Sequence, residues 1–149
     1  MKTIFDKTIG DELIARINTL TENSTPQWGK MTVQQMVKHC ILSEDMISGK
    51  IKCKRIFLGR LIGRMVLKSA MKEERLMMRN AISSPELVVT KNGGDMAADK
   101  AKWIALIEEH EHYTVPPGYV HPFFGVMTKE QIGILAYKHI DHHLRQFNS

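Results

Sequence analysis

The segment that constrains the fold most is an amphipathic pattern close to the C-terminus, at residues 128–147. It opens with Thr128-Lys-Glu-Gln131, a capping box in which the Thr128 hydroxyl accepts from the Gln131 amide while the Gln131 side chain reaches back. Apolar residues then recur at three- and four-residue steps: Ile132, Leu135, Ala136, Ile140, Leu144 and Phe147. Because this spacing gathers them on one face, the pattern predicts a helix packed on a core by that face.

Histidines interrupt this apolar stripe. His139 and His143 are four residues apart, so both imidazoles point the same way from successive turns, while His142 lies on the edge of the stripe. Two histidines at this spacing can reach one divalent cation. An imidazole on a core-facing stripe must also form hydrogen bonds or bind something to offset its desolvation. Asp141 and Arg145 are four apart too, and we expect them to face outward as a surface ion pair of modest strength.

Four more helical patterns precede this one, at residues 8–20, 32–48, 56–71 and 97–111. The second opens with another capping box, Thr32-Val-Gln-Gln35, and Gly49 is a natural stop for it. The third contains a GxxxG pattern, Gly59 and Gly63, which predicts a close contact with another helix.

A long connection lies between the third and fourth patterns, at residues 73–95. Its loop signals are Ser84-Pro85 and Gly93-Gly94. A connection of this length suits a bundle in which one link travels the length of the helices. The sequence therefore predicts an all-α fold of one domain over residues 1–149. That fold is a four-helix bundle with a long crossover connection and an additional short helix or extended loop.

Composition places the chain among ordinary globular proteins, with 43% hydrophobic and 25% charged residues. The N-terminal residues do not show an apolar run followed by a cleavage site, and no stretch approaches the roughly 20 apolar residues of a transmembrane helix. Cys40 and Cys53 do not make a disulfide framework. We therefore expect a cytoplasmic protein.

The net charge of +5 is unevenly distributed along the chain. Residues 50–79 hold ten Lys or Arg against only Glu73 and Glu74, a net charge of +8. Such a block is either the solvated face of a helix or a surface for nucleic acid or anionic lipid. Three of its cations lie at four-residue steps on one exposed ridge: Arg60, Arg64 and Lys68. We expect the solvated face, with no nucleic-acid partner and no stable membrane association.

Some residues outside the helical stripes allow two interpretations. Trp28, in a loop with turn signals, is expected to dock that loop on the bundle, with substrate stacking as the alternative. His121 precedes a proline, and we interpret it as structural, with substrate contact as the alternative. His110 and His112, at the end of the fourth pattern, are expected to be exposed near the negative end of the helix dipole.

Histidines on two predicted helices form a candidate metal site. Facing helices of a bundle project side chains into a shared interior, where metal sites are built. His39 would join His139 and His143 to give three nitrogen ligands, the count typical of catalytic zinc sites with a fourth position for water or substrate. Polar side chains within helical reach of His39 are candidates for orienting its ring: Gln35, Ser43 and Glu44.

Three short motifs carry a resemblance to a known family: Trp28-Gly-Lys-Met-Thr-Val-Gln-Gln-Met-Val-Lys-His39, His121-Pro-Phe-Phe-Gly125 and Lys138-His-Ile-Asp-His-His-Leu-Arg-Gln146. Together they resemble the DinB/YfiT-like superfamily, and more narrowly a bacterial branch of it of unknown function, over nearly the whole chain. The resemblance implies a four-helix bundle with a long crossover that commonly forms a homodimer. It also implies a divalent metal held at the positions that match His39, His139 and His143.

The resemblance further implies a metal-dependent enzyme acting on a small-molecule substrate. Its reaction would be that of a transferase with a low-molecular-weight thiol as cosubstrate, or that of a hydrolase. Zinc and nickel are the expected metals. One alternative is a non-catalytic ligand-binding or stress-response bundle without metal. The other is nucleic-acid or membrane-surface binding through the basic residues 50–79.

Overall fold

The structure, a computed structural model, describes residues 1–72 and 75–149. Its α-helices are α1 (Lys7–Thr19), α2 (Val33–Ile47), α3 (Phe57–Ala70), α4 (Met96–Glu108) and α5 (Lys129–Gln146), and its short 3-10 helices are η1 (Pro85–Leu87) and η2 (Glu109–His112). The described residues contain no β-strand, so the all-α prediction is confirmed. Among these same residues, no helix has the length and apolar content that crossing a membrane requires.

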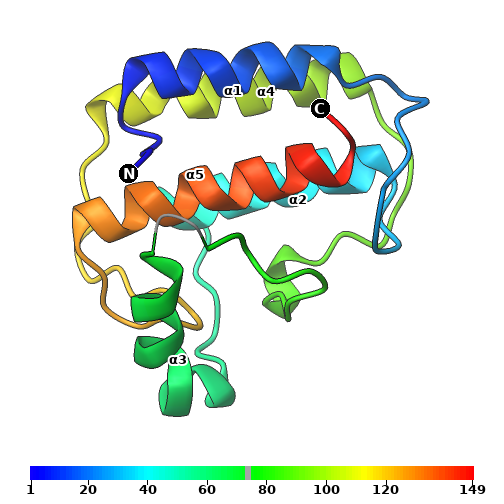
Figure 1. The fold of residues 1–149 in the computed structure, drawn as a ribbon. Helices are drawn as coiled ribbons and strands as arrows, with labels where there is room; N and C mark the ends of the chain where they lie inside the picture. The colour runs from blue at the N-terminus through cyan, green and yellow to red at the C-terminus, as the bar shows by residue number, and fades with distance from the viewer. Residues whose placement is uncertain (73–74) are drawn as a thin grey trace.

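Four of the helices, α1, α2, α4 and α5, form a bundle (Figure 1). α1 and α4 lie side by side in one layer, and α2 and α5 lie in the other. The layers meet where α2 contacts α4 and α1 contacts α5. The predicted crossover, residues 73–95, joins α3 to α4 and contains η1, and together with α3 it makes up the connection from α2 to α4. Residues 73 and 74, with which the long loop of that prediction begins, lie outside the described residues.

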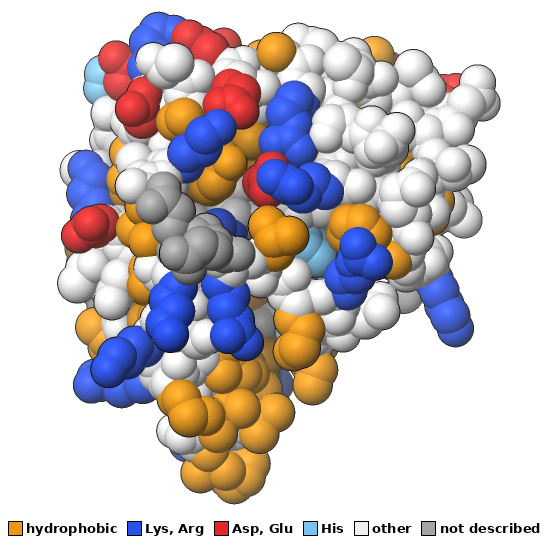
Figure 2. Space-filling view, viewed as in Figure 1, with side chains coloured by type: hydrophobic (Ala, Val, Ile, Leu, Met, Phe, Trp, Pro, Cys, Tyr) orange, Lys and Arg blue, Asp and Glu red, His pale blue; other side chains and the backbone are white. Residues whose placement is uncertain are grey.

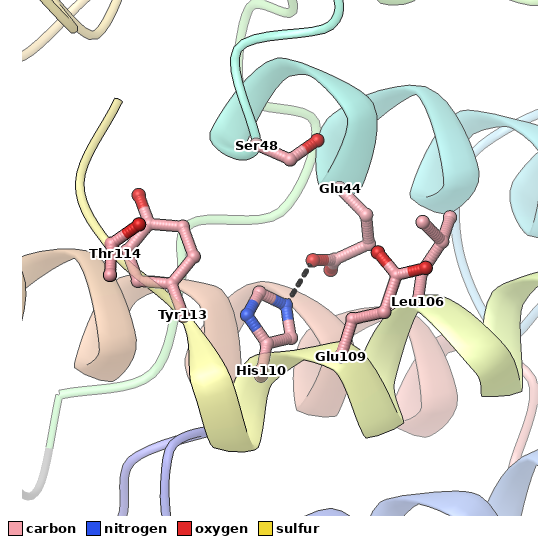
Figure 3. Close-up of a pocket in the computed structure, with 7 residues that line it drawn as sticks. All are labelled: Glu44, Ser48, Leu106, Glu109, His110, Tyr113 and Thr114. Carbon is pink, nitrogen blue, oxygen red and sulfur yellow. Dashed lines mark hydrogen bonds and ion pairs between the residues drawn. The ribbon is translucent and has the colours of Figure 1, made fainter. Parts of the chain in front are cut away.

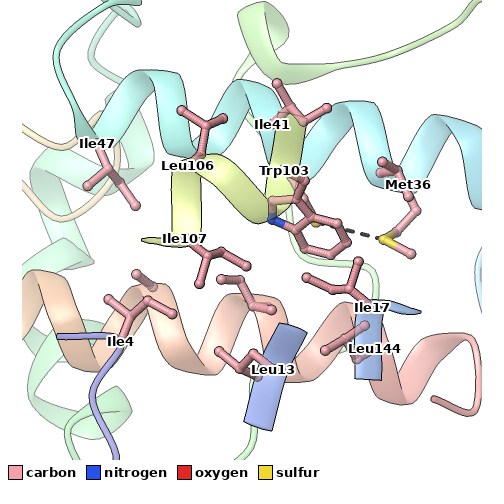
Figure 4. Packing of buried hydrophobic residues seen from close by; sticks show 14 of the residues in the cluster. Ile4, Leu13, Ile17, Met36, Ile41, Ile47, Trp103, Leu106, Ile107 and Leu144 are labelled. Atoms are coloured by element: carbon pink, nitrogen blue, oxygen red, sulfur yellow. Dashed lines mark hydrogen bonds between the residues drawn. The ribbon is translucent and has the colours of Figure 1, made fainter. Parts of the chain in front are cut away.

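The hydrophobic core lies between the two layers of the bundle (Figure 4). Trp103 of α4 is fully buried, and Ile17 of α1 and Met36 of α2 lie close to its indole ring. Ile140 and Leu144 of α5 are equally inaccessible. Each of these helices therefore buries the apolar stripe that its three- and four-residue spacing predicts.

The two predicted capping boxes are present and fix the starts of α2 and α5. The Thr32 hydroxyl accepts from the Gln35 amide at 3.2 Å, and the Gln35 side chain accepts from the Thr32 amide at 3.0 Å. Thr128 and Gln131 repeat this arrangement at the same two distances. Because each box satisfies two helix-end amides reciprocally, the two helices that carry the candidate histidines begin at defined residues.

The predicted surface pair of Asp141 and Arg145 is only half correct. Arg145 Nε does donate to Asp141 at 2.8 Å, but Asp141 is 6% exposed instead of lying on the surface. Its second carboxylate oxygen accepts from Arg16 of α1 at 2.7 Å. A carboxylate buried in this way needs cationic partners, so Asp141 joins α5 to α1 across the bundle.

α3 projects away from the bundle and packs by its glycine face on the loop before α5 (Figure 1). A Cβ atom at Gly59 or Gly63 would overlap the carbonyl oxygen of Phe123. The predicted close contact therefore exists, but its partner is loop backbone and not a helix. At the other end of α3, Lys138 of α5 donates to the carbonyl oxygens of Ala70 at 2.8 Å and Lys72 at 2.6 Å. Both ends of α3 are thus held to the rest of the molecule.

We predict opposite effects from adding one methyl group at two helical glycines. Gly63→Ala should lower the free energy of unfolding by about 1–3 kcal/mol, because its Cβ must displace the Phe123 backbone. Gly10→Ala in α1 should stabilise the protein by up to about 1 kcal/mol, because its Cβ would lie 3.8 Å from Ile107, an ordinary contact, while helix propensity improves. Urea unfolding of both variants measures the difference, and equal stabilities would contradict the packing of α3.

Candidate metal centre

Three histidines from α2 and α5 meet between the two helices. One ring nitrogen from each of His39, His139 and His143 lies within 4.8 Å of the other two. Nε2 of His39 and Nε2 of His139 are 3.1 Å apart. His39 and His143 are buried, while His139 keeps a partly exposed surface. The structure thus brings together the three residues that the sequence singled out, and the four-residue step along α5 places two of them on successive turns.

Two hydrogen bonds orient the rings of His39 and His143. Nδ1 of His39 donates to the backbone carbonyl of Leu87 at 2.9 Å, and Nδ1 of His143 donates to Oε1 of Gln146 at 2.9 Å. The Gln146 amide is itself fixed, because its nitrogen donates to the carbonyl of Trp28 at 2.7 Å. Since an oxygen acceptor requires a proton on Nδ1, each of these two neutral rings carries its free lone pair on Nε2.

The local sequence around Leu87 explains how a backbone carbonyl reaches His39. Pro85 occupies the start of η1, where its fixed backbone angle suits a helix and its missing amide costs nothing. Leu87, at the end of this one-turn helix, is buried, and η1 packs on α2. The buried leucine side chain therefore anchors η1 beside the ring of His39, and its carbonyl becomes the acceptor.

The cluster contains more lone pairs than protons. His39 and His143 present Nε2 lone pairs, and the single ring N–H of a neutral His139 can satisfy only one of them. The remaining lone pair can bind a divalent cation or accept a hydrogen bond from water.

The electrostatics of the site favour neutral rings. Burial lowers the pKa of His39, His139 and His143 below the ordinary value of 6.5, to about 3 for His143. For His139 and His143, the neighbouring imidazoles add to the effect, because two like charges at this separation repel. Neutral imidazole is the form that binds metals, so the ligand form dominates near neutral pH.

His142 lies outside the group of three. Its ring packs edge-on against Trp28, with ring centroids 5.4 Å apart, and Arg79 lies over the same indole at 4.2 Å. Trp28 is half-buried and its carbonyl is held by Gln146, so it docks its loop on α5 as predicted. A pocket of about 320 Å³ lies on this side of α5, with Trp28, Arg79 and His142 in its wall.

The side chains proposed from sequence to orient His39 have other partners. Gln35 caps α2, and Glu44 accepts from His110 at 2.6 Å (Figure 3). The prediction that His110 is exposed is wrong, because η2 turns it inward to 5% exposure; its neighbour His112 is exposed as predicted. Glu44 and His110 line a second pocket of about 220 Å³ (Figure 3). Ser43 is buried, but the acceptor that orients the His39 ring is the carbonyl of Leu87 and not the Ser43 side chain.

Of the two groups that do orient the ligand rings, one had a signal in the sequence. Gln146 follows His143 by three residues, a step that places neighbouring side chains together on a helix. Leu87 had no such signal, because it contributes a backbone carbonyl and lies 48 positions along the chain from His39.

His121 has the structural role that the sequence favoured. Its Nδ1 accepts from the amides of Phe123 at 3.1 Å and Phe124 at 3.2 Å, and its carbonyl oxygen accepts from Arg55 at 2.6 Å. These bonds close the turn on which α3 packs. Burial lowers the pKa of His121 to about 4, and the positive charge of Arg55 adds to the effect. The ring is therefore the neutral acceptor that the turn needs.

Comparison with known families identifies the chain. The family described as "Protein of unknown function (DUF1569)" matches residues 3–149, so the chain belongs to this family. No curated protein and no solved structure matches it.

We predict that His121 makes stability depend on pH. Its folded pKa of about 4 lies below the ordinary 6.5, so the unfolded chain binds its proton first as the pH falls. Its contribution to the free energy of unfolding is complete above pH 6.5 and is lost between about pH 6.5 and 4, on the order of 3 kcal/mol in all.

A non-titrating substitution isolates this contribution. His121→Asn keeps an acceptor oxygen near the position of Nδ1 but cannot take up a proton, so its stability should fall less steeply below pH 6.5. His112→Asn, at an exposed histidine, should leave the slope unchanged. Urea midpoints measured from pH 7.5 to 4.5 test this, and parallel curves for the parent and His121→Asn would refute it.

Proposed function

We propose that this member of the DUF1569 family is a metal-dependent enzyme of the DinB/YfiT-like type, with a divalent transition metal held by His39, His139 and His143. The observation that carries the proposal is the convergence of one ring nitrogen from each of three neutral imidazoles within 4.8 Å, with Nε2 of His39 facing Nε2 of His139. The single N–H of His139 cannot satisfy the Nε2 lone pairs of both His39 and His143.

The spacing of the nitrogens fits a small metal ion. Ligand atoms about 2.1 Å from a tetrahedral metal lie roughly 3.4 Å from one another. The His39 and His139 nitrogens are 3.1 Å apart and the full group lies within 4.8 Å, so the separations bracket this value. An all-imidazole ligand set suits zinc and nickel better than magnesium or calcium, which prefer oxygen.

The residues around the ligands hold the ligand protons in place. Leu87 keeps a proton on Nδ1 of His39, and Gln146 does the same for His143, so both Nε2 atoms stay available without loss of a proton. When bound, the metal supplies Lewis-acid chemistry that lowers the pKa of a water or of a thiol and so provides a nucleophile near neutral pH.

A pocket large enough for a small molecule lies on the neighbouring face of α5. Trp28, Arg79 and His142 wall it and none of the three candidate ligands does, but the His142 ring is 5.2 Å from that of His143. Transfer to or from a low-molecular-weight thiol and hydrolysis are the two reactions that such a site supports, and each requires a nucleophile of this kind.

We predict about one transition metal per chain in protein purified without a histidine tag or chelator. The His39→Ala, His139→Ala double variant should contain none, because one remaining imidazole cannot hold the ion. His142→Ala, which changes a histidine outside the group, should retain the parent's metal content. Elemental analysis by mass spectrometry measures all three proteins.

A parent that stays metal-free after incubation with zinc, nickel and manganese would refute the proposal. The histidines would then be a hydrogen-bonded polar cluster, and the chain would fit a non-catalytic ligand-binding bundle. With metal present, assays of thiol transfer and of hydrolysis on the loaded protein separate the two reactions.

The hydrogen bond from His143 to Gln146 should tune the metal affinity. Gln146→Leu preserves size but removes the acceptor, so the ring loses its fixed tautomer and orientation, and zinc affinity should fall about 10- to 100-fold. Competition with a fluorescent chelator measures the change, and Gln131→Leu, which alters only a helix cap, is the matched control. Equal zinc affinities in the two variants would show that Gln146 has no part in the site.

A further inference from the structure

α3 exposes an apolar face to solvent. Phe57, Leu61 and Met65 follow one another at four-residue steps and are 75%, 68% and 68% exposed, and Leu58 beside them is 42% exposed. A helix of a globular protein ordinarily turns such a stripe toward the core. Figure 2 shows these hydrophobic side chains gathered at the end of the molecule where α3 projects in Figure 1.

Basic residues lie directly beside this apolar face (Figure 2). Arg60, Arg64 and Lys68 are all exposed and form a second stripe along α3. Residues 46–72 contain eight Lys or Arg and no Asp or Glu. The exposed end of the molecule is therefore both apolar and strongly cationic, with no carboxylate of α3 to offset its charge.

The outward direction of the apolar face is built into the packing of α3. Gly59, Gly63 and Leu67 are its buried residues, and the first two lie against the backbone of Phe123. Because no larger side chain fits between α3 and that loop, the helix cannot rotate to bury its apolar stripe. Lys138 holds its C-terminal carbonyls, so the apolar face is presented in a fixed direction.

In place of the solvated face expected from the sequence, we propose that α3 docks on the surface of a lipid bilayer containing anionic lipids, with its apolar stripe in the interfacial region and its cations among the headgroups. A helix in the plane of the interface requires an apolar face of this kind flanked by Lys and Arg. Each basic residue adds attraction to an anionic surface, and the apolar side chains add burial.

The charges favour lipid over the other occupants of this face. A second copy of the chain docked through the same face would bring two helices together that each carry three exposed cations and no carboxylate. Nucleic acid would complement the charge but would leave Phe57, Leu61 and Met65 in water. Of these three occupants, only an anionic lipid surface satisfies both stripes at once.

Sedimentation of the full chain with vesicles tests the proposal. Vesicles of phosphatidylglycerol and phosphatidylcholine should bind the protein at low salt, and vesicles of phosphatidylcholine alone should not. Changing Arg60, Arg64 and Lys68 together to Gln should weaken binding about 100-fold, because each cation contributes about five-fold to the affinity. Leu61→Gln should weaken it about 10-fold while leaving the charge unchanged.

Matched variants distinguish the effect of this face of α3 from the effects of net charge and of exposed apolar residues elsewhere on the molecule. Changing Lys30, Lys91 and Lys102 together to Gln makes the same change in net charge at exposed positions on other elements, and should leave binding within about three-fold of the parent. Val115→Gln removes an exposed apolar residue elsewhere and should have no effect. Thermal unfolding checks that each variant folds, since the substituted side chains lie at the surface.

Three outcomes would overturn the proposal. The first is a parent that does not sediment with the anionic vesicles at low salt. The second is a Leu61→Gln variant that binds the vesicles as tightly as the parent does. Binding would then depend on the cations alone, and a DNA duplex would be the next ligand to test. The third is a parent that is dimeric by analytical ultracentrifugation and becomes monomeric on Leu61→Gln, which would identify the face as an interface between copies.

Discussion

The polar groups that α5 buries each require a partner, and the partners come from different parts of the chain. Lys138 donates to the carbonyls at the end of α3, and Asp141 accepts from Arg16 of α1. Gln146 donates to the backbone of Trp28 in the loop before α2. A polar group left unpaired in the core would cost more than most single contacts contribute, so these bonds fix where each segment meets α5. The histidine cluster is one more member of this set, between α5 and α2.

The sequence predicted those features that depend on periodicity and local chemistry. Two capping boxes located the starts of α2 and α5, and the step from His139 to His143 put both rings on one side of a helix. The sequence could not predict which hydrogen-bond partner a given polar residue of α5 would have, because that partner is set by packing between segments far apart in the chain. Asp141 was therefore expected at the surface, although Arg16 lies 125 positions away. His110 was expected at the surface as well, because nothing local indicates that η2 turns it toward Glu44.

The position of α3 shows a second limit of sequence patterns. An amphipathic stripe indicates that its residues share one face of a helix. It does not indicate which face of the helix a neighbouring segment covers. In α3 the covered face contains Gly59 and Gly63, which bury almost no side chain yet permit backbone contact with Phe123. Phe57, Leu61 and Met65 lie on the opposite, exposed side, the reverse of the usual arrangement.

Lys138 and His139 are successive residues of α5 whose side chains contact different parts of the molecule. The first holds the C-terminal end of α3, and the second faces His39 in the cluster. Because one peptide bond joins them, the residue that anchors α3 and a candidate metal ligand lie on the same turn of α5. If binding at the projecting helix changes the affinity of the histidines for a metal, thermodynamic linkage requires that metal binding change the affinity of the helix by the same factor.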